Sequence, residues 1–123
     1  MVGMTSASNN QIKLLWTNPN PYADMANNST IALDLTEYFA IIIVFGEYMG
    51  DTWRRDNLTS HFCIKGQRHI CPSWYMNGTS NSSYNTARAV TVSDTGVTLS
   101  HAVSSSNTYV NHTIPRYIYG VKM

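Results

Sequence analysis

The stretch Tyr38-Phe39-Ala40-Ile41-Ile42-Ile43-Val44-Phe45 carries no charged side chain and is followed by Gly46. Its run of isoleucine and valine forms helices poorly, because branching at Cβ restricts χ1 against the preceding helical turn. The stretch is also far shorter than the ~20 apolar residues that cross a bilayer as a helix. Apolar character without alternation is typical of a strand buried on both faces, so we expect the central strand of an all-β domain here.

The rest of the chain contains further short segments with strand character. Glycines at positions 66 and 96 indicate hairpin turns, and Pro115 predicts an edge or a bulge at the start of the last strand. The pattern predicts an antiparallel β-sandwich or jelly roll of about eight strands in one domain, residues 11–123, after a flexible arm, residues 1–10. We expect strands at residues 11–16, 30–35, 38–45, 61–64, 69–74, 87–92, 97–102 and 114–121, with polar loops at 47–57 and 77–85.

The surface that this composition predicts is polar but weakly charged. The formal net charge is +1, and only 12% of the residues are charged, against a usual ~25%. Asn, Ser and Thr account for 38 of the 123 residues. Such a chain has no strong field for nucleic acid or anionic membranes, and it suits carbohydrate contacts, virion surfaces and packed homo-oligomers. Residues 1–10 lack the basic start and apolar run of a secretory signal, so we expect synthesis and assembly in a cytoplasm.

His61, Cys63, His69 and Cys71 form two H-x-C patterns. If a hairpin centres on Gly66, His61 lies opposite Cys71 and Cys63 opposite His69, an arrangement that suits a tetrahedral zinc site. A hairpin centred one residue later puts Cys63 opposite Cys71, as a disulfide requires. The spacing is not a familiar zinc signature, and cytosolic synthesis disfavours a disulfide. Free thiols, with no metal or other cofactor, are therefore the favoured interpretation.

The acidic residues show no spacing typical of an active site. Asp51 with Asp56, or Glu37 with Glu47, has the composition of a glycosidase carboxylate pair, but such acids are usually solvated loop residues. The chain contains no G-x-S-x-G, phosphate-binding loop or HExxH motif. We therefore expect a protein without enzymatic activity.

Four blocks, in order along nearly the whole chain, resemble the C-terminal module of phage and prophage tail fibres and minor structural proteins. They are Leu15–Pro21 (LWTNPNP), Leu33–Tyr38 (LDLTEY), Val90–Val97 (VTVSDTGV) and Ile114–Lys122 (IPRYIYGVK). The resemblance implies a virion structural protein, a trimeric β-module at the tip of a host-adhesion device. Two segments, residues 53–55 and 61–71, match nothing in the family pattern.

The expected function is therefore contact with host surface glycan through aromatic, arginine and amide side chains in loops. The alternative is a purely structural role as a capsid decoration or head-fibre protein. In both cases the expected partners are further copies of the chain and other virion proteins, the latter bound through residues 1–10. The candidate glycan-binding residues lie in or beside the two longest loops: Tyr48, Trp53, Arg54, Arg55, Trp74, Tyr75, Asn77 and Tyr84.

Overall fold

The protein is represented by a computed structural model that describes residues 11–21, 25, 29–46, 58–76, 83–100, 102–103, 108–109 and 113–123. The strands in chain order are β1 (Ile12–Thr17), β2 (Ser29–Ala32), β3 (Ala40–Gly46), β4 (Thr59–Ile64), β5 (Arg68–Met76), β6 (Ser83–Ser93), β7 (Gly96–Leu99), β8 (Ala102–Val103), β9 (Thr108–Tyr109) and β10 (Ile114–Val121).

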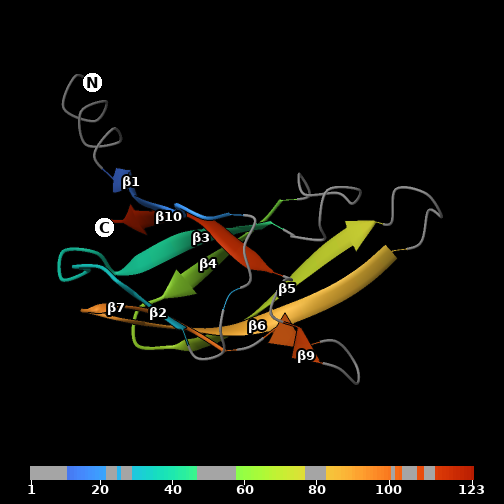
Figure 1. The fold of residues 1–123 in the computed structure, drawn as a ribbon. Helices are drawn as coiled ribbons and strands as arrows, with labels where there is room; N and C mark the ends of the chain where they lie inside the picture. Colours follow the sequence, from blue (N-terminus) through green and yellow to red (C-terminus); the bar gives the residue numbers. More distant parts are fainter. Residues whose placement is uncertain are drawn as a thin grey trace.

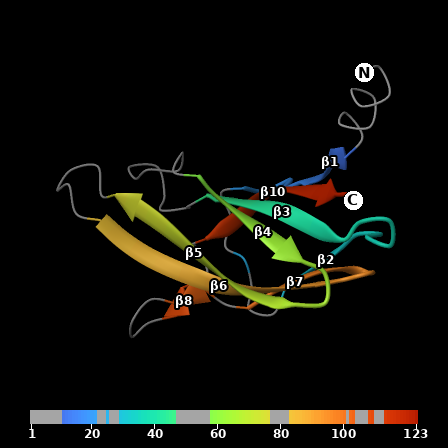
Figure 2. The same cartoon turned by 180° about the vertical axis from the view of Figure 1, so that it is seen from behind.

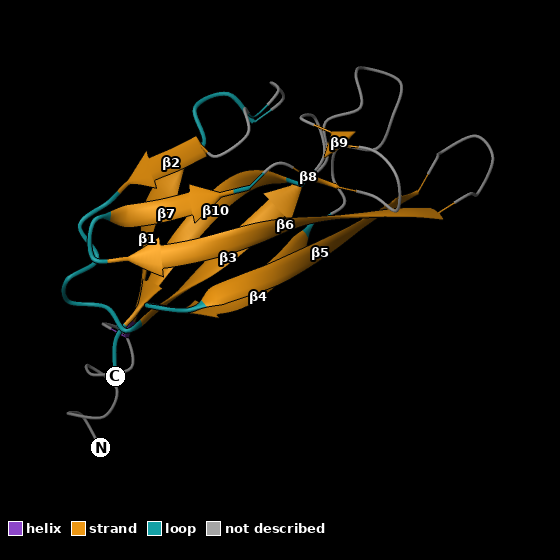
Figure 3. Ribbon diagram, turned by 90° about the horizontal axis from the view of Figure 1, so that it is seen from below, coloured by secondary structure: helices purple, strands orange, loops and turns teal. Residues whose placement is uncertain are grey.

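The strands form two antiparallel sheets, which lie in two layers (Figure 1). Sheet A has the order β1-β10-β3-β4. Sheet B has the order β2-β7-β6-β8-β9, and β5 also pairs with β6, so that β2, β7, β6 and β5 lie side by side (Figure 3). Eight strands have four or more residues, and β8 and β9 have two each. The predicted antiparallel β-sandwich of about eight strands is confirmed.

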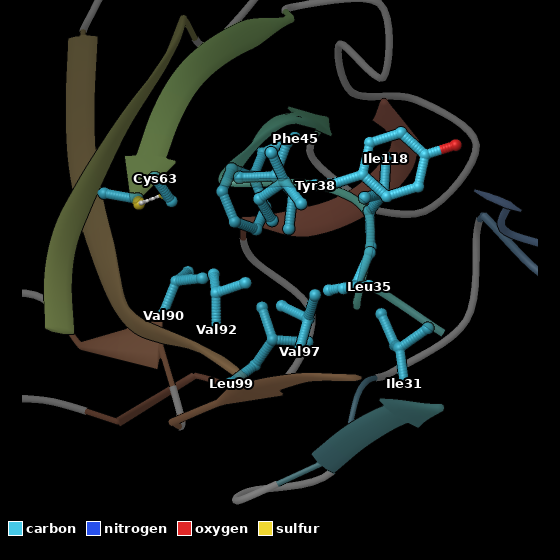
Figure 4. Packing of buried hydrophobic residues seen from close by; sticks show 13 residues of the cluster. Ile31, Leu35, Tyr38, Phe45, Cys63, Val90, Val92, Val97, Leu99 and Ile118 are labelled. Atoms are coloured by element: carbon cyan, nitrogen blue, oxygen red, sulfur yellow. Dashed lines mark hydrogen bonds between the residues drawn. The ribbon is translucent and has the colours of Figure 1, made fainter. Parts of the chain in front are cut away.

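The hydrophobic core lies between the two sheets (Figure 4). Sheet A contributes Ile41, Ile43 and Phe45 from β3, and sheet B contributes Val90 and Val92 from β6. Each of these sets follows the two-residue period of a strand, which places alternate side chains on one face. Leu35 and Tyr38, from the segment that leads into β3, complete the core although they belong to no strand.

Among the described residues, the opening stretch is not fully buried on both faces, which differs from the expectation. Ile41, Ile43 and Phe45 point into the sandwich and are fully buried. Ile42 and Val44 alternate with them, so they lie on the outer face of sheet A, where they are half-buried. The strand itself begins at Ala40, two residues later than expected.

The register of sheet A separates the two ends of the sandwich. The start of β3 pairs with the end of β10 through Ala40 and Val121, and Val121 also pairs with Ile12 at the start of β1. The end of β3, Gly46, pairs with Ile114 at the opposite end. The described parts of both chain termini therefore lie at one end of the sandwich, which we call the termini end (Figure 2).

The strands of sheet B also run between these two ends of the sandwich. The turn between β6 and β7 contains Asp94, whose carbonyl accepts a hydrogen bond from the backbone nitrogen of Leu35 (2.8 Å). Leu35 lies just before the start of β3, so this turn lies at the termini end. The end of β5 and the start of β6, paired through Met76 and Ser83, therefore lie at the other end together with Gly46. We call this the loop end, because residues 47–57 and 77–82 connect strands there.

The connection between β4 and β5 is a corner between the sheets, and the hairpin expected at residues 65–68 is wrong. Strand β4 pairs with β3 in sheet A, whereas β5 pairs along its full length with β6 in sheet B. Two backbone donors of the corner find acceptors on either side: Lys65 N donates to Phe39 O, just before β3 (2.9 Å), and Gly66 N donates to Val92 O of β6 (2.8 Å). Gly66 has φ +87°, a left-handed conformation that glycine adopts without strain.

Several predicted boundaries also differ. Strand β2 ends at Ala32, and Leu35 is buried from a loop. Strand β6 begins at Ser83, inside the loop expected at residues 77–85, because nine paired residues extend the β5–β6 ladder. Strand β7 ends at Leu99. The bulge predicted near Pro115 is present as a register shift against β3, although β10 is an inner strand of its sheet.

Candidate functional site

The candidate glycan-binding residues belong to segments attached to the loop end. Tyr48, Trp53, Arg54, Arg55 and Asn77 lie outside the described residues. Three others lie on the strands that extend toward these loops: Trp74 and Tyr75 near the end of β5, and Tyr84 near the start of β6. The register brings two of them together, because Tyr75 pairs directly with Tyr84. Trp74 pairs with Asn85.

The core changes from apolar to polar toward the loop end. On β6, Thr86 and Arg88 follow the same two-residue period as Val90 and Val92, so they also face sheet A. Arg88 is only 1% exposed, and Thr86 is buried as well. We missed this feature in the sequence, although a charged residue in phase with core valines is a readable signal.

Arg88 connects three separate segments of the chain. Its Nε donates to the carbonyl oxygen of Thr113 (2.9 Å), and its Nη1 donates to the carbonyl oxygen of Ser100 (2.6 Å). The hydroxyl groups of Thr86 and Thr113 share a hydrogen bond of 2.5 Å. A buried guanidinium needs such acceptors, because desolvation of the charge is costly without them. We call Thr86, Arg88, Ser100 and Thr113 the polar clamp.

Thr113 adopts a backbone conformation that its residue type disfavours. Its φ is +52°, in the left-handed region that a β-branched residue rarely enters. Such strain, on the order of 1–3 kcal/mol, persists where the surrounding structure holds the residue in place. Here Arg88 binds its carbonyl and Thr86 binds its hydroxyl. The polar clamp thereby sets the direction in which the chain enters β10 at Ile114.

A second arginine lies against the last residue of β3. The side chain of Arg116, on β10, packs over Gly46 so closely that a Cβ at position 46 would lie 2.6 Å from the guanidinium carbon. Arg116 is 9% exposed. A side chain at position 46 would therefore have to displace the end of the Arg116 side chain. Gly46 is also the residue from which segment 47–57 departs.

The described part of the loop end provides positioning rather than acid–base chemistry. The described carboxylates are Asp34, Glu37 and Asp94, and all three lie at the termini end. Asp34 accepts hydrogen bonds from the hydroxyl and backbone nitrogen of Thr36, which lower the pKa of its carboxyl. Of the proposed carboxylate pairs, Glu37 is separated from residue 47 by the whole of β3, and Asp51 and Asp56 lie outside the described residues.

The H-x-C motifs meet across the β4–β5 corner in an arrangement that differs from the one expected for zinc. Cys63 lies 3.8 Å from Cys71, sulfur to sulfur, and both are fully buried free thiols (Figure 4). His61 Nε2 lies 2.7 Å from the carbonyl oxygen of Pro72. His69 Nε2 accepts a hydrogen bond from the backbone nitrogen of Ile64 (2.9 Å).

The two histidines therefore bind the backbone of the opposite strand, so the pairing expected for a metal site is wrong. No group of three or more metal-ligating side chains occurs among the residues that the structure describes. The two thiols share a hydrogen bond in which either sulfur can be the donor, and this bond lowers the pKa of Cys63. The same hydrogen bond, together with burial, raises the pKa of Cys71.

Comparisons with models of protein families, with curated proteins and with solved structures find no match for this chain. Within the described ranges, the structure contains no helix with the length and apolar character that crossing a membrane requires.

Proposed function

We propose that the chain is a phage virion structural protein whose loop end binds host surface glycan. The observation that carries this proposal is that the chain termini and two long connecting segments are attached at opposite ends of the sandwich. The strand ends that bound segments 47–57 and 77–82 lie together at the loop end, and the described parts of both termini lie at the opposite end. A module attached to a particle near its termini would present these two segments outward.

The residue types in and beside these segments suit a sugar ligand. Trp53, Tyr48 and Tyr84 offer aromatic faces for stacking on pyranose rings, and Arg54 and Asn77 offer hydrogen-bond donors. The Arg116 side chain packs on Gly46, from which segment 47–57 departs, and the polar clamp holds Thr113, next to Ile114, which pairs with Gly46. Fixed strand ends reduce the entropy that a binding loop loses when it takes up a ligand.

A glycan array probed with the purified chain tests the proposal. Trp53→Ala and Tyr84→Ala should each weaken binding about five- to tenfold, since one aromatic contact contributes about 1–1.5 kcal/mol. Thr30→Ala is the control, because Thr30 is exposed on β2 of sheet B, which pairs with β7 next to the turn at the termini end. Equal losses in all three variants would contradict a binding site at the loop end.

The alternative is a purely structural role as a decoration or head-fibre protein. Such a protein needs an attachment end and a stable sandwich, but no glycan site. Absence of binding to any sugar or host cell, combined with tight binding to empty capsids, would favour this alternative. Deletion of residues 1–10 should leave folding intact and reduce incorporation into particles in either case.

A further inference from the structure

Two of the three rows of side chains on the outer face of sheet A are largely apolar across all four strands. The register aligns its outward residues in three rows, and the middle row consists of Leu14, Tyr119, Ile42 and Phe62. Leu14 and Phe62 are each 48% exposed. The two flanking rows are Ile12, Val121, Ala40 and Ile64 on one side, and Thr17, Tyr117, Val44 and Ser60 on the other. No row contains a charged residue.

The outer face of sheet B shows what a solvent-facing sheet looks like in this same chain. Its corresponding row across four strands is Thr30, Thr98, Thr91 and Arg68, all exposed. Two of these threonines share a hydrogen bond between their hydroxyl groups (3.2 Å). The outer face of sheet B also carries exposed apolar side chains, Ile70 (60%) and Val103 (40%), but no apolar row crosses four of its strands. On sheet A such rows cross all four strands, which scattered apolar side chains on a surface do not explain.

We infer that the outer face of sheet A is an interface at which further copies of this chain pack together. Four strands about 4.8 Å apart and rows that span about 20 Å of strand give roughly 400 Å² of flat sheet per copy. That is at the size above which a contiguous apolar patch marks an interaction site. Two such faces bury roughly 800 Å², which is below the ~1,200–2,000 Å² of a standard stable interface and is the size of a weaker, reversible one.

A second copy suits this face better than other occupants do. An uncharged apolar face is complementary to itself, so no separate partner with matching charges is required. A glycan would find few polar groups there, namely the hydroxyls of Thr17, Ser60 and the two tyrosines. Residues 1–10 offer only Met1, Val2, Met4 and Ala7 as apolar side chains, which are too few to cover three rows.

Self-association through sheet A also explains the opening stretch. Residues 38–45 have the composition of a strand buried on both faces, yet the sandwich covers only one. The second face becomes buried when copies pack together. Two copies can pack across a twofold axis, or three can surround a threefold axis. Neither arrangement depends on sugar binding at the loop end.

Multi-angle light scattering of the full chain, over a series of concentrations, tests this inference. We expect a dimer or trimer at micromolar concentration. Phe62→Lys on β4 and Leu14→Lys on β1 place a charge at opposite edges of the face, and each should raise the dissociation constant about a hundredfold. Thr30→Lys is the matched control, since Thr30 is exposed on the edge strand of sheet B. It should change the dissociation constant less than twofold.

Circular dichroism of the diluted variants separates loss of association from loss of folding. Folded, monomeric Phe62→Lys or Leu14→Lys protein beside an oligomeric control supports the interface. A wild-type monomer at ~100 μM would overturn it, as would equal weakening by Thr30→Lys. A chain that associates only after deletion of residues 1–10 would overturn it too, because that segment would then cover the face.

Discussion

The alternation along β3 can be tested with the same substitution at two neighbouring isoleucines. Ile43 is fully buried in the core between the sheets, whereas Ile42 is half-buried on the outer face of sheet A. Ile43→Ala and Ile42→Ala remove the same three carbon atoms from the same strand. Any difference between them therefore reports which face of β3 points into the sandwich.

The expected magnitudes follow from burial. Loss of about three methylene equivalents from a buried site costs about 2.4 kcal/mol in transfer free energy, and the cavity that remains raises the total to about 3–4 kcal/mol. At Ile42 about half of the transfer term applies and no closed cavity forms, so about 1 kcal/mol is expected. With a urea m-value of about 2 kcal/mol/M, the unfolding midpoint should fall by about 1.5–2 M for Ile43→Ala and about 0.5 M for Ile42→Ala.

Urea unfolding followed by circular dichroism measures both midpoints. The protein should be dilute enough for light scattering to show monomers, so that association through the outer face does not add to the stability of Ile42. Equal shifts for the two variants, or a larger shift for Ile42→Ala, would refute the assigned orientation of β3.

Three further predictions concern the rest of the fold. Arg88→Met should lower the free energy of unfolding by about 2 kcal/mol, because the carbonyls of Thr113 and Ser100 lose their donor; unchanged urea unfolding would contradict a clamp. Gly96→Ala should cost about 1–3 kcal/mol, because a Cβ there would collide with the backbone of β2; an unshifted thermal midpoint would contradict that close approach. Oxidised glutathione should convert the thiols of Cys63 and Cys71 to a disulfide, releasing two molecules of reduced glutathione. A bridged loop of this length should stabilise the fold by about 2–3 kcal/mol. Thiols that remain titratable after unfolding would show that no bridge forms.

Local patterns in the sequence were sufficient for the fold class and for most strands. The unbroken apolar run at residues 38–45 indicates a buried strand by its composition. The alternation around Ile31 and the segments on either side of Gly96 report the two-residue period that the backbone imposes on side chains. The same period would also have identified Arg88 as inward-facing. The candidate glycan-binding residues could be chosen only by their position in loops, and most of them lie outside the described residues.

Tertiary structure alone decided which strands pair. The segment around Gly66 has the local features of a hairpin, yet β4 and β5 belong to different sheets, because β5 gains a longer ladder with β6. That choice brings Cys63 to Cys71 and turns the nearby histidines toward the backbone. Likewise, the sequence marks both faces of β3 as apolar, but only the packed sandwich shows which face remains uncovered. Pairing and coverage depend on contacts between residues far apart in the chain, and a local period contains no information about them.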